Sequence, residues 1–355
     1  MEIKPAFVEN NIAIALASDD YFAPYMAVTI KSMIEHSSLK NNYDILVVTT
    51  DISAEKRKIL SKIIEEKKNF SLRFVNPNRI LLNFTPYLHS HFGHIETYYR
   101  VILHELFPDY EKMLYLDSDM IVHADVAELF SENVDGFLLA ACRDADTAGL
   151  YNGADPGRKN YSDEVLKLEK PYQYFQAGTI LFNLSEFRNS FKTEYILVFS
   201  ASEKWLLQDQ DVLNKLCEGR VKFVGMEWNV MTDNEKKRIN ENIALAPNWL
   251  SKMYMEARKR PKIIHYAGPE KPWFSPEMDM ADEFWRVART SPFYEVFLYR
   301  MSCSAIMREM QKLKRRNIFQ QVSLIIKKCR QRGFISSIAY MPVWISRKVG
   351  VHIKK

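Results

Sequence analysis

Short β-branched runs alternate with helical patterns along the first hundred residues, and this alternation narrows the possible folds most. Residues 12–17 and 45–50 are apolar runs typical of buried strands, and residues 26–34 between them repeat apolar side chains at helical spacing. A second helical pattern follows Ser53, a good N-cap, and residues 71–75 predict a third strand. This alternation predicts an α/β fold, with helices on the faces of a parallel sheet.

The same kind of pattern continues through the middle of the chain. A helix over 95–107 is expected to lead into a short strand over 112–116. Further strands are predicted over 137–141, 179–183 and 262–265, and a helix over 209–216.

The C-terminal part has a different composition, so we expect a main domain over 1–275 and a helical, basic region over 276–355. Residues 301–355 contain 13 Lys and Arg but one acidic residue, Glu309. Because the whole chain carries +5, the preceding 300 residues carry −7. An acidic main body argues against nucleic acid as a partner.

The bulk features point to a cytoplasmic protein. The N-terminus shows no basic segment followed by an apolar run and a cleavage site, so we do not expect secretion. No apolar run approaches the roughly 18 residues that a membrane-spanning helix needs. The four cysteines, Cys142, Cys217, Cys303 and Cys329, are widely spaced and predict free thiols.

Candidate metal ligands follow two predicted strands. Asp117 and Asp119 come directly after the strand over 112–116, and His265 ends the strand over 262–265, with Lys271 nearby. Paired carboxylates suit Mg²⁺ or Mn²⁺, an imidazole could complete the site, and a lysine could hold a phosphate. Taken singly, each of these residues is better explained by structure, as a helix cap or turn, a core histidine or a surface lysine.

Two other acidic segments have both a functional and a structural interpretation. Asp209, Gln210 and Asp211 begin a predicted helix, where they could bind a ligand or cap the helix. Asp19 and Asp20 end the first strand, where α/β sheets bind nucleotides and where Asp also forms turns.

Together these segments resemble the family 8 retaining glycosyltransferases, the group that includes bacterial lipopolysaccharide galactosyl- and glucosyltransferases and the glycogenins. Four motifs match in order between residues 11 and 275: Ala-Leu-Ala-Ser-Asp-Asp at 15–20, Leu-Tyr-Leu-Asp-Ser-Asp at 114–119, Asp-Gln-Asp at 209–211, and His-Tyr-Ala-Gly-Pro-Glu-Lys-Pro-Trp at 265–273. The resemblance implies a GT-A type fold, a Rossmann-like mixed sheet with flanking helices, followed by a small helical C-terminal region.

The resemblance also implies the roles of individual residues. Asp117, Asp119 and His265 would bind Mn²⁺ or Mg²⁺ against the diphosphate of a UDP-sugar. Asp209 and Gln210 would be the catalytic pair on the face of the donor sugar opposite the leaving group. The remaining donor-binding residues would be Ala17, Ser18, Asp19, Asp20, Tyr21, Arg100, Ser118, Asp144, Gln176, Ala177, Gly268 and Lys271.

The implied reaction moves galactose or glucose from the UDP-sugar to a saccharide or lipid-linked acceptor, with retention of configuration. Gln210 is an amide and a poor nucleophile, so we favour front-face transfer over a covalent intermediate on Asp209. The family commonly has Asn-Ala-Gly where this chain has Gln176-Ala177-Gly178, which predicts a shifted sugar pocket.

Alternatives to this interpretation remain at this stage. A haloacid-dehalogenase-like phosphatase would also end a strand in Asp-x-Asp, but after its first strand. A non-catalytic sugar-nucleotide or glycan-binding protein would share the motifs. The basic, amphipathic residues 312–332 predict attachment to the anionic inner face of the cell membrane, or else a basic face packed on the acidic body.

Overall fold

The computed structural model describes residues 3–82, 84–86 and 94–314, and these form two compact units. The first is Met1–Phe297 and the second is Leu298–Lys355. All described strands belong to the first unit, which therefore contains the candidate site. Most of the basic segment over 312–332 lies outside the described residues.

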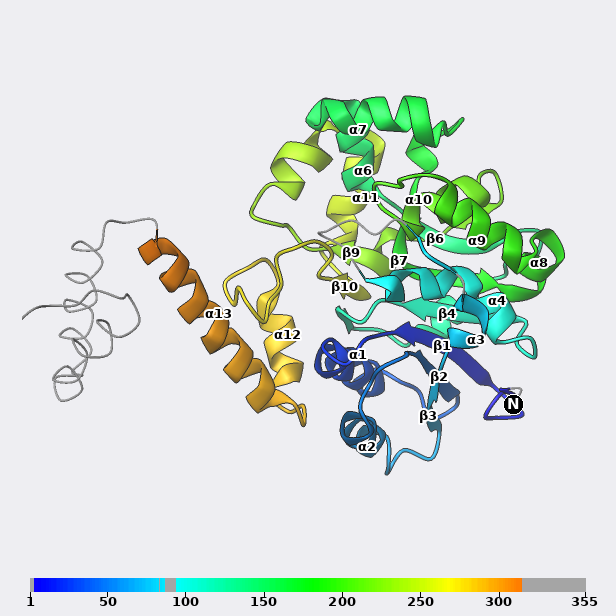
Figure 1. Cartoon of the computed structure of the whole chain (residues 1–355), viewed down its shortest axis with the longest axis vertical. Coiled ribbons are helices and arrows are strands. Elements are labelled where there is room, and N and C mark those ends of the chain that lie inside the picture. Colours follow the sequence, from blue (N-terminus) through cyan, green and yellow to red (C-terminus); the bar gives the residue numbers. More distant parts are fainter. Residues whose placement is uncertain (1–2, 83, 87–93, 315–355) are drawn as a thin grey trace, which may run out of the picture. The chain divides into compact units, whose positions relative to one another are not determined.

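A seven-stranded mixed sheet forms the centre of the first unit (Figure 1). Its strand order is β3-β2-β1-β4-β7-β6-β8, and β7 runs antiparallel to both neighbours while the other pairs are parallel. The predicted parallel arrangement holds for β1 to β3, and the full sheet is the mixed sheet of a GT-A fold. The strands are β1 (Asn11–Ala17), β2 (Asn42–Val48), β3 (Phe70–Val75), β4 (Lys112–Leu116), β6 (Leu139–Arg143), β7 (Phe175–Asn183) and β8 (Val221–Phe223).

Helices α1 (Ala23–Glu35) and α2 (Ala54–Ile63) follow β1 and β2, as the periodicity predicts. The hydroxyl of Ser53 accepts a hydrogen bond from the amide of Lys56 and so caps α2. The other α-helices are α3 (Asn78–Leu81), α4 (Leu103–Leu106), α5 (Val126–Phe130), α6 (Ala145–Gly149), α7 (Pro156–Tyr161), α8 (Leu184–Ser190), α9 (Thr193–Ser202), α10 (Asp209–Leu216), α11 (Asn248–Ala257), α12 (Ala281–Ala288) and α13 (Tyr294–Lys314).

The single helix expected over 95–107 is replaced by a 3₁₀ helix, Ile95–Ile102, followed by the short helix α4. Five consecutive residues from Tyr98 to Ile102 are buried. In a regular α-helix, some of these five side chains would face solvent. Packing contacts on all sides therefore determine the backbone geometry of this segment.

A second, three-stranded sheet carries one end of the candidate site. It has the order β5-β10-β9, with β5 (Met120–Val122), β9 (Val230–Met231) and β10 (Ile263–His265). His265 pairs with Met120, the residue after Asp119, so this sheet brings the end of the last described strand to the Asp-x-Asp turn. Strands β5, β8 and β9 were not predicted, because two or three residues leave no periodic pattern.

The first unit extends past the predicted boundary at residue 275. Trp273 stacks on Tyr25 of α1 with ring centroids 3.9 Å apart, and Phe284 of α12 lies 5.3 Å from the same Trp273 ring. Phe297 also stacks on Tyr25. The compact unit therefore ends at Phe297, while the functional boundary at 275 remains a prediction.

Two further expectations concern the cysteines and the membrane. Cys142 and Cys217 are free and buried, Cys303 is free and partly exposed, and Cys329 lies outside the described residues. Within the described residues, no helix combines the length and the apolar content needed to span a bilayer.

Candidate active site

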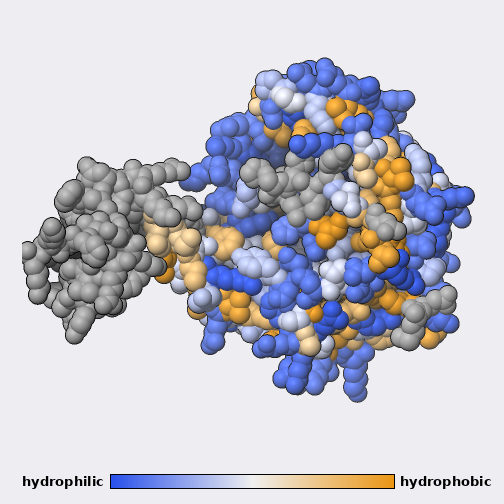
Figure 2. Space-filling view, in the orientation of Figure 1, coloured by the Kyte–Doolittle hydropathy of each residue, from blue (hydrophilic) through white to orange (hydrophobic). Residues whose placement is uncertain are grey.

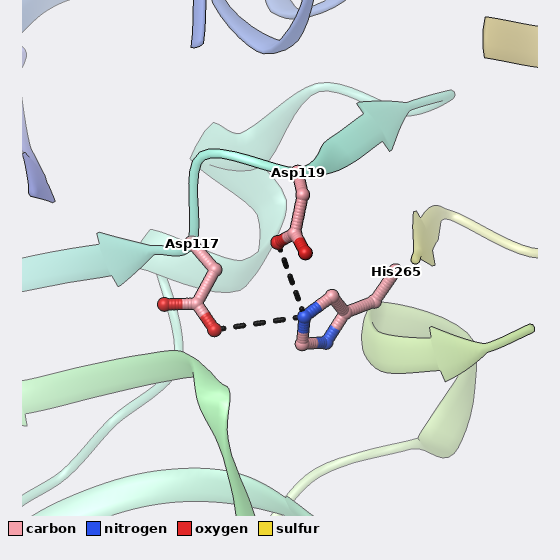
Figure 3. A group of neighbouring side chains, drawn as sticks. All are labelled: Asp117, Asp119 and His265. Atoms are coloured by element: carbon pink, nitrogen blue, oxygen red, sulfur yellow. Dashed lines mark ion pairs between the residues drawn. The ribbon is translucent and has the colours of Figure 1, made fainter. Parts of the chain in front are cut away.

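Two carboxylates and an imidazole converge at the junction of the two sheets (Figure 3). Asp117 and Asp119 lie in the turn between β4 and β5, and His265 ends β10. The Nε2 atom of His265 lies 3.5 Å from Asp117 Oδ2 and 3.3 Å from Asp119 Oδ1. Neighbouring ligands of a six-coordinate ion with bonds of about 2.1 Å lie about 3 Å apart, so these donors fit Mg²⁺ or Mn²⁺.

Asn229 orients the imidazole of His265. Its Oδ1 atom lies 2.9 Å from His265 Nδ1, and its amide nitrogen donates to Gln176 Oε1. A hydrogen bond at Nδ1 leaves the Nε2 lone pair facing the carboxylates, which is the arrangement a metal-binding histidine needs. Gln176 also accepts a hydrogen bond from the amide of Gly178, so the predicted donor-binding residue Gln176 lies beside the site.

The backbone at Gly178 comes very close to the metal ligands. A Cβ atom added there would lie 2.4 Å from His265 Cε1 and 2.8 Å from Asp117 Oδ2. The amide of Asp117 also donates to the carbonyl of Gly178. Only glycine fits this position of β7.

Lys271 places a positive charge on the second carboxylate. Its ammonium group lies 2.5 Å from Asp119 Oδ2 and also donates to the carbonyl of Tyr266. Burial opposes ionisation, but the charge of Lys271 and the neighbouring His265 hold the pKa of Asp119 well below its usual range. The stack of Trp273 on Tyr25 anchors the loop that carries this lysine.

Arg100 connects the metal cluster to the predicted catalytic pair. Its guanidinium group is buried and lies 2.9 Å from Asp117 Oδ1 and 2.9 Å from Asp209 Oδ2. It also donates to the carbonyl of Ala177 and stacks on the ring of Tyr115, 4.4 Å from the centroid. One cation therefore balances the half-buried carboxylate of Asp117 and the buried carboxylate of Asp209.

Asp209 and Gln210 begin α10 and both are buried. Burial raises the pKa of Asp209 to about 6, although Arg100 partly opposes the shift. Among the described residues, Asp209 Oδ2 has no hydrogen-bond donor, because the N–H of Arg100 nearest to it donates to Thr97. Buried carboxylate oxygens normally have such a donor, and the contact that this oxygen makes instead is the ion pair with Arg100 at 2.9 Å.

Gln210 is held at both ends of its amide. Its oxygen accepts from the backbone amide of Ala177 at 2.9 Å, and its nitrogen donates to Asp144 Oδ2 at 3.2 Å. Asp144 caps α6 and is itself buried, and burial together with the charge of Asp146 raises its pKa. The structure thus joins Gln210, Ala177 and Asp144 in one hydrogen-bonded group.

Asp211, the last residue of the Asp-Gln-Asp motif, has a structural environment. It is completely buried and accepts hydrogen bonds from Arg158, Tyr161, Tyr174 and the amide of Leu207. These contacts hold the turn at Gln208, whose φ of +50° lies in the left-handed region. This turn positions Asp209 and Gln210 at the start of α10.

The N-terminal motif lies against the Asp-x-Asp turn through one hydrogen bond, from the Ser118 hydroxyl to the carbonyl of Ala17. Asp19 accepts from the amide of Phe22, at the start of α1, and the Ser18 hydroxyl donates to the carbonyl of Asp19.

The carboxylate of Asp20 pairs with Lys56 and accepts a hydrogen bond from the amide of Ser53. This is the structural role in a turn, the alternative to nucleotide binding for this residue. Tyr21 is 46% exposed. Contacts of Ala17, Ser18, Asp19, Asp20 and Tyr21 with a nucleotide remain predictions.

Gly268 occupies the loop after His265 with a φ of +103°, and an added Cβ would lie 2.4 Å from Asn234. The left-handed backbone explains the glycine, while its predicted phosphate contact is untested.

Most predicted site residues are connected by direct contacts, while Asn229 and Tyr115 add contacts that the sequence analysis did not assign. Tyr115 donates its hydroxyl to Asp117 Oδ1 at 3.0 Å. Tyr115 belongs to the motif at 114–119, so the sequence did mark this position. Asn229 follows no predicted strand, and no sequence pattern singles it out.

Comparisons with known proteins agree with this geometry. The family model described as "Glycosyl transferase family 8" matches residues 13–277. A putative glycosyltransferase of Haemophilus influenzae is 30% identical over 73% of this chain and 72% of its own length. The lipopolysaccharide 1,2-glucosyltransferase of Escherichia coli is 24% identical over 50% of this chain and 48% of its own.

Solved structures show the same fold. The bifunctional glycosyltransferase WbbM in its apo form superposes with a TM-score of 0.76 at 27% identity, over 84% of this chain and 53% of that chain. This chain therefore spans about half of WbbM. The galactosyltransferase LgtC, solved with donor and acceptor sugar analogues, superposes with a TM-score of 0.63 at 24% identity, over 79% of this chain and 96% of that chain.

Proposed function

The chain belongs to glycosyltransferase family 8, and from this premise we propose that it is a retaining hexosyltransferase that moves galactose or glucose from a UDP-sugar to a glycan or lipid-linked saccharide. The observation that carries the proposal is the cluster of Asp117, Asp119 and His265, which Arg100 links to the buried carboxylate of Asp209. In this proposal, one buried cation, Arg100, joins the diphosphate site to the sugar site.

Asp117, Asp119 and His265 are proposed to hold Mn²⁺ or Mg²⁺. When bound, the ion would stabilise the negative charge that develops on the UDP leaving group, which removes the need for a general acid. Lys271, already 2.5 Å from Asp119, would move its charge to a phosphate oxygen. Arg100 would keep Asp117 oriented, since its guanidinium group contacts the carboxylate oxygen that does not face His265.

Front-face transfer fits the fixed amide of Gln210. The acceptor hydroxyl would attack the anomeric carbon as the bond to UDP breaks, and its proton would pass to the departing diphosphate. Gln210 has one oxygen lone pair left after its bond to Ala177, and this lone pair could stabilise the positive charge on the sugar ring. Asp209 would accept a hydrogen bond from a sugar hydroxyl. The rival mechanism, a covalent intermediate on Asp209, would give a glycosyl adduct detectable by mass spectrometry.

The basic C-terminal region is proposed to attach the enzyme to the anionic inner face of the cell membrane, where it would meet acceptors for lipopolysaccharide or another surface polysaccharide. The likeness to a lipopolysaccharide glucosyltransferase supports this acceptor class. Sedimentation of the full-length protein with anionic liposomes at low salt tests the attachment, and a protein left in the supernatant would contradict it.

The deciding experiment measures UDP release from a panel of UDP-sugars with Mn²⁺, with EDTA, and with the Asp119→Ala variant. Turnover of one sugar that depends on metal and is lost in the variant would support the proposal and identify the donor. Binding without turnover, even with saccharide acceptors present, would favour the alternative of a sugar-nucleotide or glycan-binding protein. If no UDP-sugar bound at all, both assignments would be wrong.

A further inference from the structure

A pocket of about 130 Å³ lies within the segment over 147–174. Its inner wall is buried and includes Thr147, Leu166 and Tyr174, while Asp163 and Lys167 lie at its exposed rim. The surface over α7, at the top of the view in Figure 2, mixes hydrophilic and hydrophobic residues. Two π-helical turns flank α7 in this segment, and such turns are frequent at functional sites.

The pocket shares its inner wall with the reaction centre. The Tyr174 hydroxyl donates to Asp211 at 2.6 Å, and the Thr147 hydroxyl donates to the Asp144 oxygen that also accepts from Gln210. None of the predicted metal or phosphate ligands lines the pocket. It is therefore a separate site, and Thr147 in its wall connects to Gln210 through the carboxylate of Asp144.

The lining has both polar and apolar parts, as a sugar ring requires. The Ser162 hydroxyl makes no hydrogen bond to the other described residues. Asp163 contributes a half-exposed carboxylate, whose Oδ2 pairs with Lys159 at 2.7 Å. Leu166, Leu168 and Pro171 supply apolar surface for the C–H groups of a ring. Such a mixture of apolar surface and a few polar groups is typical of small-molecule sites.

The volume matches a single ring. A water molecule needs about 10–15 Å³ of such space, so the pocket has room for roughly ten non-hydrogen atoms. A hexose is close to this size and a nucleotide is much larger. Lys167 is the one cation that lines the pocket among the described residues, which argues against a phosphate ligand, since phosphate sites usually combine several donors.

We propose that this pocket is a second saccharide site that binds one hexose ring outside the donor site. The inference rests on the proposed hexosyltransferase function, and the ring could belong to a non-reacting sugar of the acceptor or to a free monosaccharide that acts as an effector. Because Thr147 and Tyr174 contact the partners of Gln210, an occupied pocket would also steady the catalytic amide.

Saturation-transfer NMR tests the site on the full-length protein, with methyl glucoside and methyl galactoside as probes and excess UDP and Mg²⁺ filling the donor site. We expect binding of at least one glycoside near a Kd of about 1 mM, the range for a ligand of this size. The variant Asp163→Ala should weaken it about tenfold, since a charged hydrogen bond is lost. Ser162→Leu, which fills the pocket, should abolish it.

Lys170→Met is the matched control, because Lys170 is exposed and close in sequence but does not line the pocket. The control should bind like the unaltered protein. Absence of glycoside binding, displacement of the glycoside by UDP-sugar, or equal binding by Asp163→Ala would each overturn the inference.

Kinetic measurements distinguish the two possible sources of the bound ring, a sugar of the acceptor and a free monosaccharide effector. If it belongs to the acceptor, Asp163→Ala should raise the acceptor KM while leaving the slow, acceptor-independent hydrolysis of UDP-sugar unchanged. If it is an effector, added methyl glycoside should change that hydrolysis in the unaltered protein but not in the variant. An unaltered protein that binds glycoside yet never turns over a UDP-sugar would refute the proposed function and leave the second site standing.

Discussion

The amide oxygen of Asn229 lies 2.9 Å from Nδ1 of His265 and fixes the direction of the imidazole. Both side chains are buried, and Asn229 is in turn bound to Gln176. The orientation of His265 therefore depends on Asn229, which lies 36 positions away in the sequence. In the described structure, Asn229 makes no hydrogen bond to either aspartate.

Replacing Asn229 should weaken metal binding. We expect Asn229→Ala to lower Mn²⁺ affinity by about 10- to 100-fold, the usual effect of removing the partner that orients a metal-binding histidine. Isothermal titration with Mn²⁺ measures the change, and Asn248→Ala, at an exposed asparagine of α11, is the control. Equal affinity in both variants would show that His265 needs no orientation by Asn229.

A methyl group at Gly178 should disrupt the metal site more severely. In Gly178→Ala the new Cβ would overlap the imidazole of His265 and the carboxylate of Asp117, so one ligand must move. We expect metal-dependent UDP release to fall at least about 100-fold, as for misplaced catalytic groups. Gly157→Ala is the control, since its Cβ would meet only the side chain of Asp155 at 3.3 Å. Normal turnover in Gly178→Ala would contradict the close approach.

The longer strands and the place of the two aspartates after β4 could be predicted because both depend on local patterns. Strand β4 and helix α10 have the bounds that periodicity indicated, and the two aspartates follow a buried strand. The 3₁₀ helix over Ile95–Ile102 and the very short strands escaped prediction, because long-range packing determines them and they leave little pattern in the sequence.

The contacts within the site were less predictable. Asp20 matched a nucleotide-binding motif, yet its carboxylate is bound to Lys56 and to the start of α2. Asp211 stands beside the predicted catalytic pair in the sequence, but four donors from outside the motif surround it. Neither environment follows from spacing, since the partners come from other segments.

Gln210→Ala should keep appreciable transfer activity if Gln210 stabilises charge and does not act as a nucleophile. Loss of one preorganised electrostatic contact lowers kcat by about 100- to 1000-fold. The assay is transfer from the UDP-sugar identified by the release panel, with UDP affinity as the control for folding and donor binding. Complete loss of activity with normal UDP binding would count against this role.

Arg158 should be needed chiefly to balance Asp211. Both side chains are buried and their charged groups lie 3.2 Å apart. Arg158→Met leaves the carboxylate without its cation, so we expect the free energy of unfolding to fall by about 3–5 kcal/mol. Adding Asp211→Asn should restore part of that loss, because the unpaired charge is removed. A double variant less stable than Arg158→Met in urea unfolding would contradict this account.

His104 should make the stability of the protein depend on pH. Its side chain is 2% exposed, and burial lowers the pKa of His104 to about 4, although Glu105 opposes the shift and Arg188 adds to it. Between the folded pKa and the unfolded value of about 6.5, the unfolded chain binds the extra proton. The stabilisation that His104 contributes is therefore complete above pH 6.5 and is lost as pH falls from 6.5 towards 4, by up to about 3 kcal/mol.

Urea unfolding at several pH values between 4.5 and 7.5 checks this dependence, with His104→Gln as the comparison. Glutamine does not titrate, and its amide can still reach the hydroxyl of Thr193, which lies 3.1 Å from His104 Nε2. The variant should lose less stability than the unaltered protein on acidification, because other groups titrate equally in both. If the two stability curves stay parallel across this range, His104 is not a buried neutral imidazole that must be protonated on unfolding.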